Sequence, residues 1–126
     1  MILDTCFLID LQRELRKRVA GRANCFLKER PRTHFCISVI SVTEFLEGFE
    51  QSSEGERFLR PYARVAVDSK VAAQAAVIRR ELRLGGNLIG DFDILIAATA
   101  ICESIPLVTK NIDEFKLVAG LELVTY

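Results

Sequence analysis

The segment IGDFDILIAATA, residues 89–100, places two aspartates at the start of an almost wholly apolar helix. Asp91, or Gly90, can cap this helix, which leaves Asp93 inside the first turn with apolar neighbours nearly all round. The helix dipole offsets only a small part of the cost of burying a carboxylate without a partner. We therefore interpret Asp91 as the helix cap and expect Asp93 to face a cation or a metal ion.

Two further acids are candidates for the same chemistry. Asp4 ends the apolar stretch 1–3, where it could also simply cap the helix that follows. Glu44 lies on an expected helix over 39–50, turned away from its apolar face, and by itself it fits a solvated surface glutamate. Gly48, one turn later, leaves space beside Glu44 for something bound there.

A fourth group of polar residues follows the last part of the predicted sheet. The segment TKNIDEF, residues 109–115, comes directly after an expected strand at 106–108 and offers Asn111, Asp113 and Glu114. By itself the segment also fits a turn with a helix cap. Because sites in folds of this kind form at the carboxyl ends of strands, we expect these side chains to lie near the other acids.

Oxygen ligands of this kind favour Mg²⁺ or Mn²⁺, and such ions activate water and neutralise a phosphate under attack. Glycoside hydrolysis also uses two carboxylates, but it usually needs a cleft rich in aromatics, and this chain has no Trp and only two Tyr. The sequence contains no GxxxxGK(S/T), GxGxxG or GxSxG motif. Nucleotide hydrolysis, dinucleotide binding and esterase activity are therefore not expected.

The elements that must position these residues alternate between strand and helix. Strands are expected at 1–3, 34–38, 65–67, 106–108 and 121–125. Helices are expected at 6–14, 16–29, 39–50, 69–84, 91–103 and 111–116, with a short one before Pro61. The pattern predicts an α/β fold with a mostly parallel central sheet and helices on both faces. With 126 residues, 50% of them hydrophobic, the chain is expected to form a single domain over 1–126.

The charges balance overall, with 17 basic and 17 acidic side chains, but they are unevenly distributed. The densest basic stretch runs from Arg13 to Arg32, and it is either a solvated helix face or a phosphate-contacting surface. The neutral total argues against strong non-specific nucleic-acid binding by the free chain.

The four cysteines, Cys6, Cys25, Cys36 and Cys102, form no CxxC pair, and His34 is the only histidine. We therefore expect small buried hydrophobes rather than a structural zinc site or a Cys–His nucleophile. No apolar run reaches the roughly 18 residues of a membrane span, and no basic stretch precedes MILDT as in a signal peptide. A cytoplasmic protein with no membrane partner is expected.

Taken in order, four motifs resemble those of PIN domains. MILDTCFLID resembles the opening strand and acid, ISVISVTEFLEG the second acidic motif, and IGDFDILIAATA the third. LVTKNIDEF, followed by GLELV, resembles the fourth motif and the closing strand. The order, the spacing and the length resemble the small VapC toxins of prokaryotic VapBC toxin–antitoxin pairs, and the resemblance covers essentially the whole chain.

By this resemblance, Asp4, Glu44 and Asp93 match the three acidic positions of the family's catalytic metal site. Asn111 stands where the family often has an aspartate, so it would join the site with Asp113, or with Glu114, and the number of metals stays open. Three hydroxyl residues beside these positions would orient ligands or waters: Thr5, Ser38 and Thr109.

The resemblance implies a Mg²⁺- or Mn²⁺-dependent endoribonuclease that leaves a 5′-phosphate and a 3′-hydroxyl. Such family members cut tRNA or rRNA at exposed loops, usually form homodimers, and are silenced in a hetero-oligomer by a VapB-type antitoxin. The antitoxin's tail often brings a basic residue near the acids, where it offsets the same negative charge as the metal. The segment from Arg13 to Arg32 would then grip RNA or pack against the antitoxin.

Three other hypotheses remain at this point. One is a housekeeping PIN nuclease of RNA processing, which would lack a neighbouring antitoxin gene. Another is a non-catalytic binding module that keeps the acids without the activity, since Asn111 replaces an acid. The third is a doubly wound phospho-acceptor domain with Asp4 as the acceptor, but the acidic pair and the acceptor position that it needs are not found.

Overall fold

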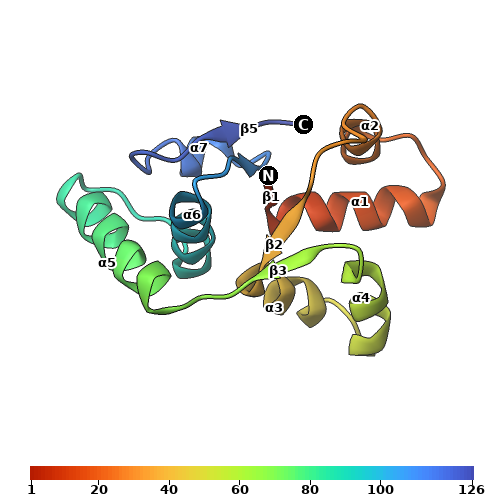
Figure 1. Cartoon of the computed structure of the whole chain (residues 1–126), viewed down its shortest axis with the longest axis horizontal. Coiled ribbons are helices and arrows are strands. Elements are labelled where there is room, and N and C mark those ends of the chain that lie inside the picture. Colours follow the sequence, from red (N-terminus) through yellow and green to blue (C-terminus); the bar gives the residue numbers. More distant parts are fainter.

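The chain folds around a five-stranded sheet in which all neighbouring strands are parallel. Its strands are β1 (Ile2–Leu3), β2 (Cys36–Ser38), β3 (Ala63–Val65), β4 (Leu107–Val108) and β5 (Leu123–Val124). In the computed structural model, which describes residues 1–126, the order across the sheet is β3-β2-β1-β4-β5. The central strand is therefore β1, and later strands add outward from it on either side (Figure 1).

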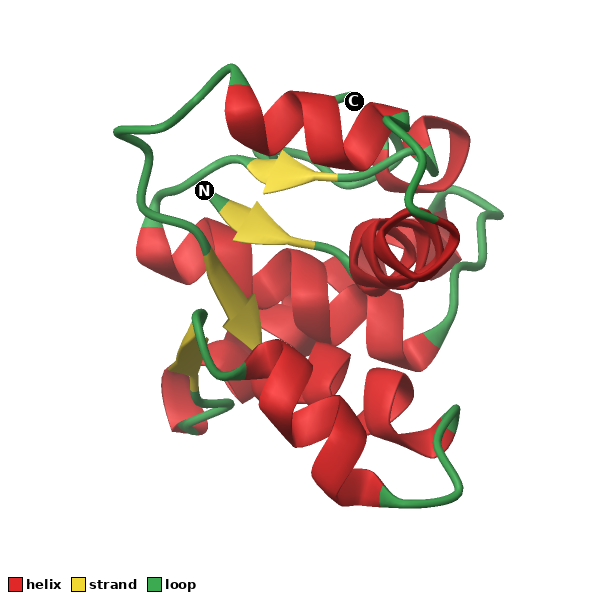
Figure 2. Ribbon diagram, turned by 90° about the vertical axis from the view of Figure 1, so that its right-hand side faces the viewer, coloured by secondary structure: helices red, strands yellow, loops and turns green.

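Seven helices surround the sheet. They are α1 (Thr5–Lys17), α2 (Arg22–Lys28), α3 (Val39–Glu47), α4 (Ser52–Leu59), α5 (Ser69–Leu84), α6 (Asp91–Glu103) and α7 (Ile112–Phe115). Figure 2 shows helices on both sides of the strands, which confirms the predicted α/β fold with a parallel sheet. None of the helices combines the length and the apolarity needed to cross a membrane.

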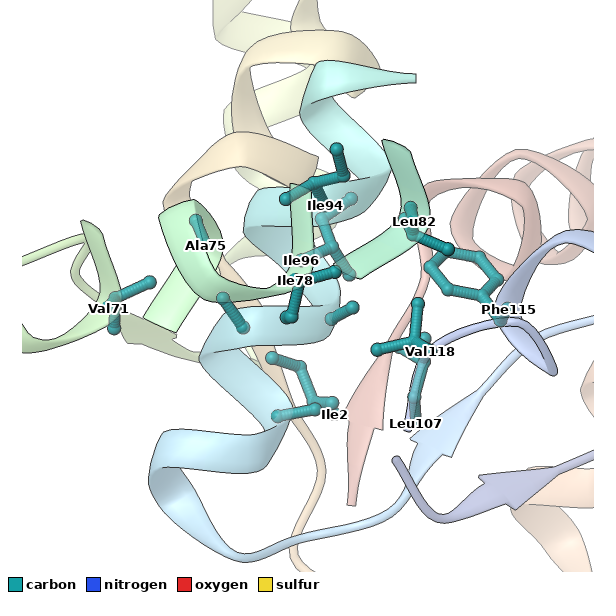
Figure 3. Close-up of a cluster of buried hydrophobic side chains, with 13 residues drawn as sticks. Ile2, Val71, Ala75, Ile78, Leu82, Ile94, Ile96, Leu107, Phe115 and Val118 are labelled. Carbon is teal, nitrogen blue, oxygen red and sulfur yellow. The ribbon is translucent and has the colours of Figure 1, made fainter. Parts of the chain in front are cut away.

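Two hydrophobic clusters lie on opposite faces of the sheet. Because successive strand residues point to opposite faces, Ile2 joins the cluster with α5 and α6, and Leu3 joins the cluster with α1, α2 and α3. Leu107 and Val108 of β4 divide in the same way. Figure 3 shows the first cluster, where side chains of α5 and α6 meet Ile2. Burial on both faces explains why β1 and β4 are wholly apolar, whereas the outer strand β3 is largely exposed and contains Arg64.

Two helices have the bounds that the sequence predicts, α5 and α6. The predicted N-cap of α5 is confirmed, since the Asp68 carboxylate accepts a hydrogen bond from the Val71 N–H at 2.9 Å. The interpretation of Asp91 as the cap of α6 is wrong. Gly90 is the N-cap, and Asp91 is the first helical residue, drawn outward into an ion pair of 3.0 Å with Arg79.

The short strands are predicted less well than the helices. The third strand occupies Ala63–Val65 instead of 65–67, because its pairing with β2 aligns Ala63 with Cys36 and Val65 with Ser38. The expected helix over 39–50 ends at Glu47. Strand bounds of two or three residues are set by these pairings, which local hydrophobicity does not encode.

Candidate active site

The topology brings three chain segments to one edge of the sheet. Asp4 directly follows β1, Ser38 ends β2 before α3, and Thr109 directly follows β4. Since β1 lies between β2 and β4, its carboxyl end is the point where the direction of strand addition reverses. Open parallel sheets form their ligand sites at such a switch point.

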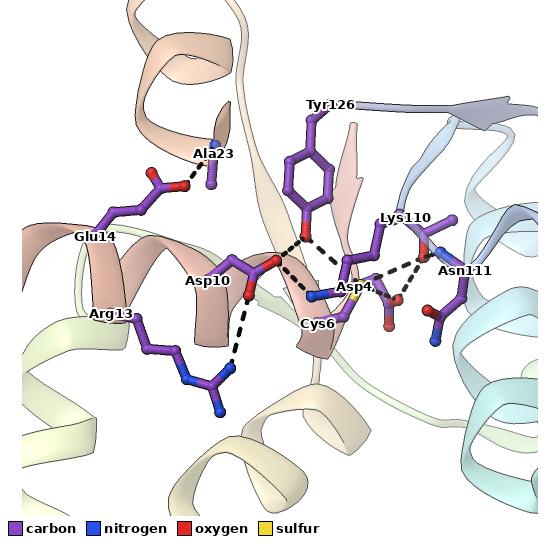
Figure 4. A network of polar contacts seen from close by, with 10 residues as sticks. Asp4, Cys6, Asp10, Arg13, Glu14, Ala23, Lys110, Asn111 and Tyr126 are labelled. Carbon is purple, nitrogen blue, oxygen red and sulfur yellow. Dashed lines mark hydrogen bonds and ion pairs between the residues drawn. The ribbon is translucent and has the colours of Figure 1, made fainter. Parts of the chain in front are cut away.

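Asp4 lies at the centre of this edge and is held on both carboxylate oxygens. It is 3% exposed. Its Oδ1 accepts a hydrogen bond from the Thr5 N–H at 2.7 Å, which also makes Asp4 the N-cap of α1. Its Oδ2 accepts from the Thr109 hydroxyl at 2.7 Å and from the Cys6 thiol at 2.9 Å (Figure 4). The Asp4 carboxylate therefore both caps α1 and belongs to the candidate site.

Glu44 reaches the site from α3. Its Oε2 accepts a hydrogen bond from the Thr5 hydroxyl at 2.5 Å. Burial raises the pKa of Glu44, and the charges of Asp4 and Glu47 raise it further against the opposing effect of Thr5. Ser41, one helical turn earlier on the same side of α3, has a buried hydroxyl without a hydrogen-bond partner.

Asp93 is the clearest case of a carboxylate whose negative charge is not compensated by its surroundings. Its neighbours from Ile94 to Ala100 are buried except for Leu95, which confirms the predicted burial of the helix. Burial raises the pKa of Asp93 to about 6, and the nearby carboxylates of Asp4, Glu114 and Glu44 add to the rise. The carboxylate folds over Gly90, where an added Cβ would lie 2.9 Å from Oδ2.

The polar residues of the fourth motif, 109–115, differ in how close they come to the acidic cluster. The Asn111 N–H donates to the Thr109 hydroxyl at 3.0 Å, and its side chain lies at the start of α7 without a capping hydrogen bond. The structure does not bring Asp113 to the other acids: its side chain is 93% exposed and paired with Lys116 at 2.5 Å. Glu114 is the acid of this motif whose charge reaches Asp93.

The donor set suits a hard divalent cation. None of the six ion pairs of the structure includes Asp4, Glu44 or Asp93, so the negative charge of this cluster has no cationic partner. The structure contains no group of three or more His, Cys, Asp or Glu side chains placed to hold a metal ion by themselves. An ion such as Mg²⁺ keeps several of its waters, so it needs fewer direct protein ligands.

Two features of the site are absent from the sequence-based prediction. The first is Cys6, which is half-buried and whose thiol donates a hydrogen bond to Asp4. Burial and the nearby Asp4 charge raise the pKa of this thiol to about 11, so it stays protonated and can act as a donor. The feature of the sequence that points to Cys6 is its position two residues after Asp4. Cys25 is exposed, which contradicts the expectation that every cysteine is buried. The second feature is a contact between Asp10, Lys110 and Tyr126.

A groove runs from Glu44 along the outside of the molecule. It has a volume of about 1040 Å³ and lies between α1, α3 and α4. Its apolar part includes Leu15, Phe49 and Phe58, and its rim carries Arg13, Arg16 and Arg57 with several glutamates. Five of its fourteen lining residues are hydrophobic, so the groove offers an apolar strip with a charged rim, as an amphipathic peptide needs.

The chain is similar to known proteins over most of its length. The family model described as "PIN domain" matches residues 1–121. The chain is 39% identical to "Ribonuclease VapC2" of Haemophilus influenzae, and the match covers 68% of this chain and 70% of that protein. It is 36% identical to the "tRNA(fMet)-specific endonuclease VapC" of Shigella flexneri, with the same two coverages.

The similarity extends to the three-dimensional fold of a solved structure. The fold is similar to that of VapBC2 from Rickettsia felis, which was solved bound to a DNA fragment from its promoter. The TM-score is 0.83 at 26% sequence identity, and the match covers 99% of this chain and 97% of the other.

Proposed function

This chain belongs to the PIN domain family, among the VapC ribonucleases, and from that premise we propose that it is the endoribonuclease toxin of a VapBC pair, dependent on Mg²⁺ or Mn²⁺. The observation that carries the proposal is the set of Asp4, Glu44 and Asp93 at one strand edge without a cationic partner. Such a cluster is costly unless a cation joins it, and a nuclease needs a cation there.

Each residue has a distinct part in this site. Asp4 presents a carboxylate that cannot rotate, because both oxygens are held by hydrogen bonds. Glu44 is oriented by Thr5, and Asp93 is held above Gly90 at the N-terminus of α6. When bound, a divalent ion would activate water and neutralise the attacked phosphate. A bound cation would favour the ionised form of Asp93, whose pKa of about 6 in the metal-free protein would then fall.

The proposed substrate is RNA, with exposed tRNA or rRNA loops as the target class. A similar protein carries the name tRNA(fMet)-specific endonuclease, which supports tRNA as the first substrate to test. Glu44 lines the groove between α1, α3 and α4, which would give a splayed nucleotide strand access to the site from that side.

The proposed partner is a VapB-type antitoxin. The groove that starts at Glu44 gives an amphipathic helix an apolar floor and a rim of both charge signs. A basic side chain at the end of such a segment would reach the carboxylates and offset their charge. Inhibition and metal binding would then compete for the same negative charge.

The experiment that tests the function is induced expression in a bacterial host, followed by sequencing of new 5′-phosphate RNA ends. Three chains are compared: the parent, Asp93→Asn and Asp91→Asn. Asp91 is the matched control, because it is an acid in the same first turn of α6 that pairs with Arg79 instead of facing the cluster. We expect growth arrest and discrete RNA ends with the parent and Asp91→Asn, and neither with Asp93→Asn.

Two results would contradict the proposal. Equal cleavage by Asp93→Asn and the parent would exclude the assigned site. A parent that binds its site metal but leaves the RNA of several hosts uncut would favour a non-catalytic binding module.

A further inference from the structure

Three side chains converge on the carboxylate of Asp10 beside the acidic cluster (Figure 4). The Lys110 ammonium lies 2.5 Å from Oδ2, the Tyr126 hydroxyl donates to the same oxygen at 3.0 Å, and Arg13 lies 3.9 Å from Oδ1. Burial alone would raise the pKa of Asp10, but the hydrogen bonds from Lys110 and Tyr126 lower it overall. These contacts join α1, the β4–α7 connection and the last residue of the chain.

The contact between Lys110 and Asp10 matters because Lys110 lies beside the acidic cluster. Lys110 follows Thr109, whose hydroxyl holds Asp4 at 2.7 Å. The Tyr126 hydroxyl also contacts the Cys6 sulfur at 3.8 Å, and the Cys6 thiol in turn donates to Asp4. Asp10 lies six residues after Asp4, about 9 Å further along α1. The Lys110 backbone is therefore next to the acidic cluster, while its ammonium is directed away from it.

A lysine at this place has two competing partners. Its flexible stem would allow the ammonium to turn toward Asp4, Glu44 and Asp93, which have no cation of their own. An ammonium there would neutralise the cluster and oppose the binding of a divalent ion. Asp10 offers a carboxylate that is already oriented by Tyr126, and its side chain is only 23% exposed.

We propose that Asp10, with Tyr126, is a positioning residue that holds Lys110 out of the carboxylate cluster and at its rim, where the ammonium binds a phosphate of the RNA. The proposal rests on the proposed nuclease function. Lys110 is 47% exposed and Arg13 is 66% exposed, so both can contact a ligand without leaving Asp10. Two cations share one carboxylate, which leaves a net positive charge for a phosphodiester.

The first test measures Mn²⁺ binding by calorimetry, without RNA, for Asp10→Asn, Lys110→Met and the double variant. We expect Asp10→Asn to weaken Mn²⁺ binding about tenfold, because the released Lys110 ammonium would compete with the ion for the carboxylates, an effect similar in size to the loss of an outer-shell partner. Lys110→Met should bind Mn²⁺ at least as tightly as the parent, and Asp10→Asn with Lys110→Met should regain parental affinity. Circular dichroism and thermal unfolding establish that each variant is folded.

Two matched controls separate this effect from net charge. Asp113→Asn breaks the other aspartate–lysine pair of 2.5 Å, with Lys116, and should leave Mn²⁺ affinity unchanged within about twofold. Asp10→Asn combined with Lys116→Met restores the net charge but leaves Lys110 free, so it should stay as weak as Asp10→Asn. Parental affinity in Asp10→Asn, or no recovery when Lys110 is also replaced, would overturn the positioning role.

The second test measures RNA binding in the inactive Asp93→Asn background with EDTA present. Lys110→Met should reduce the slope of log affinity against log salt by about 0.7, the value for one contact with a single-stranded phosphate. Lys116→Met should leave the slope unchanged. An unchanged slope in Lys110→Met would overturn the phosphate contact. If Asp93→Asn binds Mn²⁺ like the parent, the nuclease site itself is misassigned, which is a separate failure.

Discussion

At the scale of single residues, the site is a set of carboxylates that the fold holds close together at a cost. Asp93 is the clearest case, because three other acids and its own burial oppose its charge. Thr5, Cys6 and Thr109 orient Glu44 and Asp4 through hydrogen bonds, but no arginine or lysine forms an ion pair with any of the three acids. A bound cation would relieve the repulsion between the carboxylates, and this relief would strengthen its binding.

The pH dependence of stability follows from the raised pKa values of Asp93 and Glu44. A raised pKa means that the folded protein holds the proton more tightly than the unfolded chain, so stability is present at low pH and lost as pH rises. For Asp93 the loss occurs between its usual value near 3.8 and about 6. The metal-free protein should therefore unfold at a higher temperature at pH 5 than at pH 7.5, as measured by calorimetry with EDTA.

The matched variant for this measurement is Asp93→Asn, which removes the titrating group. Its unfolding temperature should depend much less on pH, and at pH 7.5 it should be more stable than the metal-free parent, by about 1 kcal/mol after allowance for solvent screening. Asp10 and Asp113 have lowered pKa values and act at lower pH, below this window. A parent that loses stability from pH 7.5 to 5 would contradict the arrangement of charges.

Gly90 gives a second prediction at this scale. An alanine Cβ at this position would lie 2.9 Å from Oδ2 of Asp93, so the carboxylate must move. Because that oxygen ends a flexible side chain, Gly90→Ala should change the free energy of unfolding by less than about 1 kcal/mol. Cleavage should nevertheless fall at least about tenfold, since the carboxylate that we propose as a metal ligand is displaced. Gly85→Ala, far from the acids, serves as the control.

At the scale of elements, helices α1 and α6 present the site through their N-termini. Asp4 caps α1, and Asp93 lies in the first turn of α6, where the helix dipole favours negative charge. Each helix is anchored by a fully apolar side in one of the two cores. The carboxylates are therefore fixed relative to one another by packing, and no flexible loop is needed to assemble them.

Substitution of Asp4 separates its capping role from its role in the site. Asp4→Ala loses the cap and leaves two buried donors unpaired, so it should lower the free energy of unfolding by about 2 kcal/mol. Asp4→Asn keeps an oxygen that can cap and should cost clearly less. Both variants should lose Mn²⁺ binding and cleavage, measured beside chemical unfolding. If Asp4→Asn cleaves RNA like the parent, Asp4 is a cap only.

The same scale shows what the sequence could predict. The bounds of α5 and α6 follow from local signals, a cap at Asp68 and paired glycines after Leu84. Asp4 and Asp93 are visible because each interrupts or opens an apolar stretch, whereas Glu44 by itself looks like a surface glutamate and is predicted only through the family resemblance. The N-cap of α6 is Gly90, whose carbonyl accepts a hydrogen bond from the Ile94 N–H at 3.0 Å, and the Asp91 side chain pairs with Arg79 instead of capping the helix. Lys110 and Asp10 are 100 residues apart, and no spacing rule predicts their contact.

At the scale of the whole molecule, one sheet edge joins the carboxylates, the basic rim and the groove. The central place of β1 brings residues from the beginning, middle and end of the chain to this edge. Glu44 belongs to both the acidic cluster and the groove, so a segment lying in the groove ends at the site. Inhibition by such a segment needs no change of shape in the nuclease.

The groove predicts a variant that separates inhibition from activity. Leu15 is 51% exposed on the groove and distant in sequence from the acids. Leu15→Glu should change stability by no more than about 0.5 kcal/mol, since the side chain is at the surface. Co-expressed antitoxin should no longer rescue growth, while RNA cleavage by the purified variant stays parental. Leu88→Glu, an exposed leucine outside the groove, should still be rescued.

The measurement that tests the central claim most directly is cleavage of tRNA by the purified protein, with Mg²⁺ or EDTA, in the parent, Asp93→Asn and Asp91→Asn. We predict cleavage with 5′-phosphate ends by the parent and by Asp91→Asn in Mg²⁺. No cleavage is predicted in EDTA, and Asp93→Asn should lose more than about 100-fold, beyond the usual cost of an outer-shell partner. Cleavage that survives EDTA, or that Asp93→Asn retains at the parental rate, would contradict a metal-dependent nuclease built on this carboxylate.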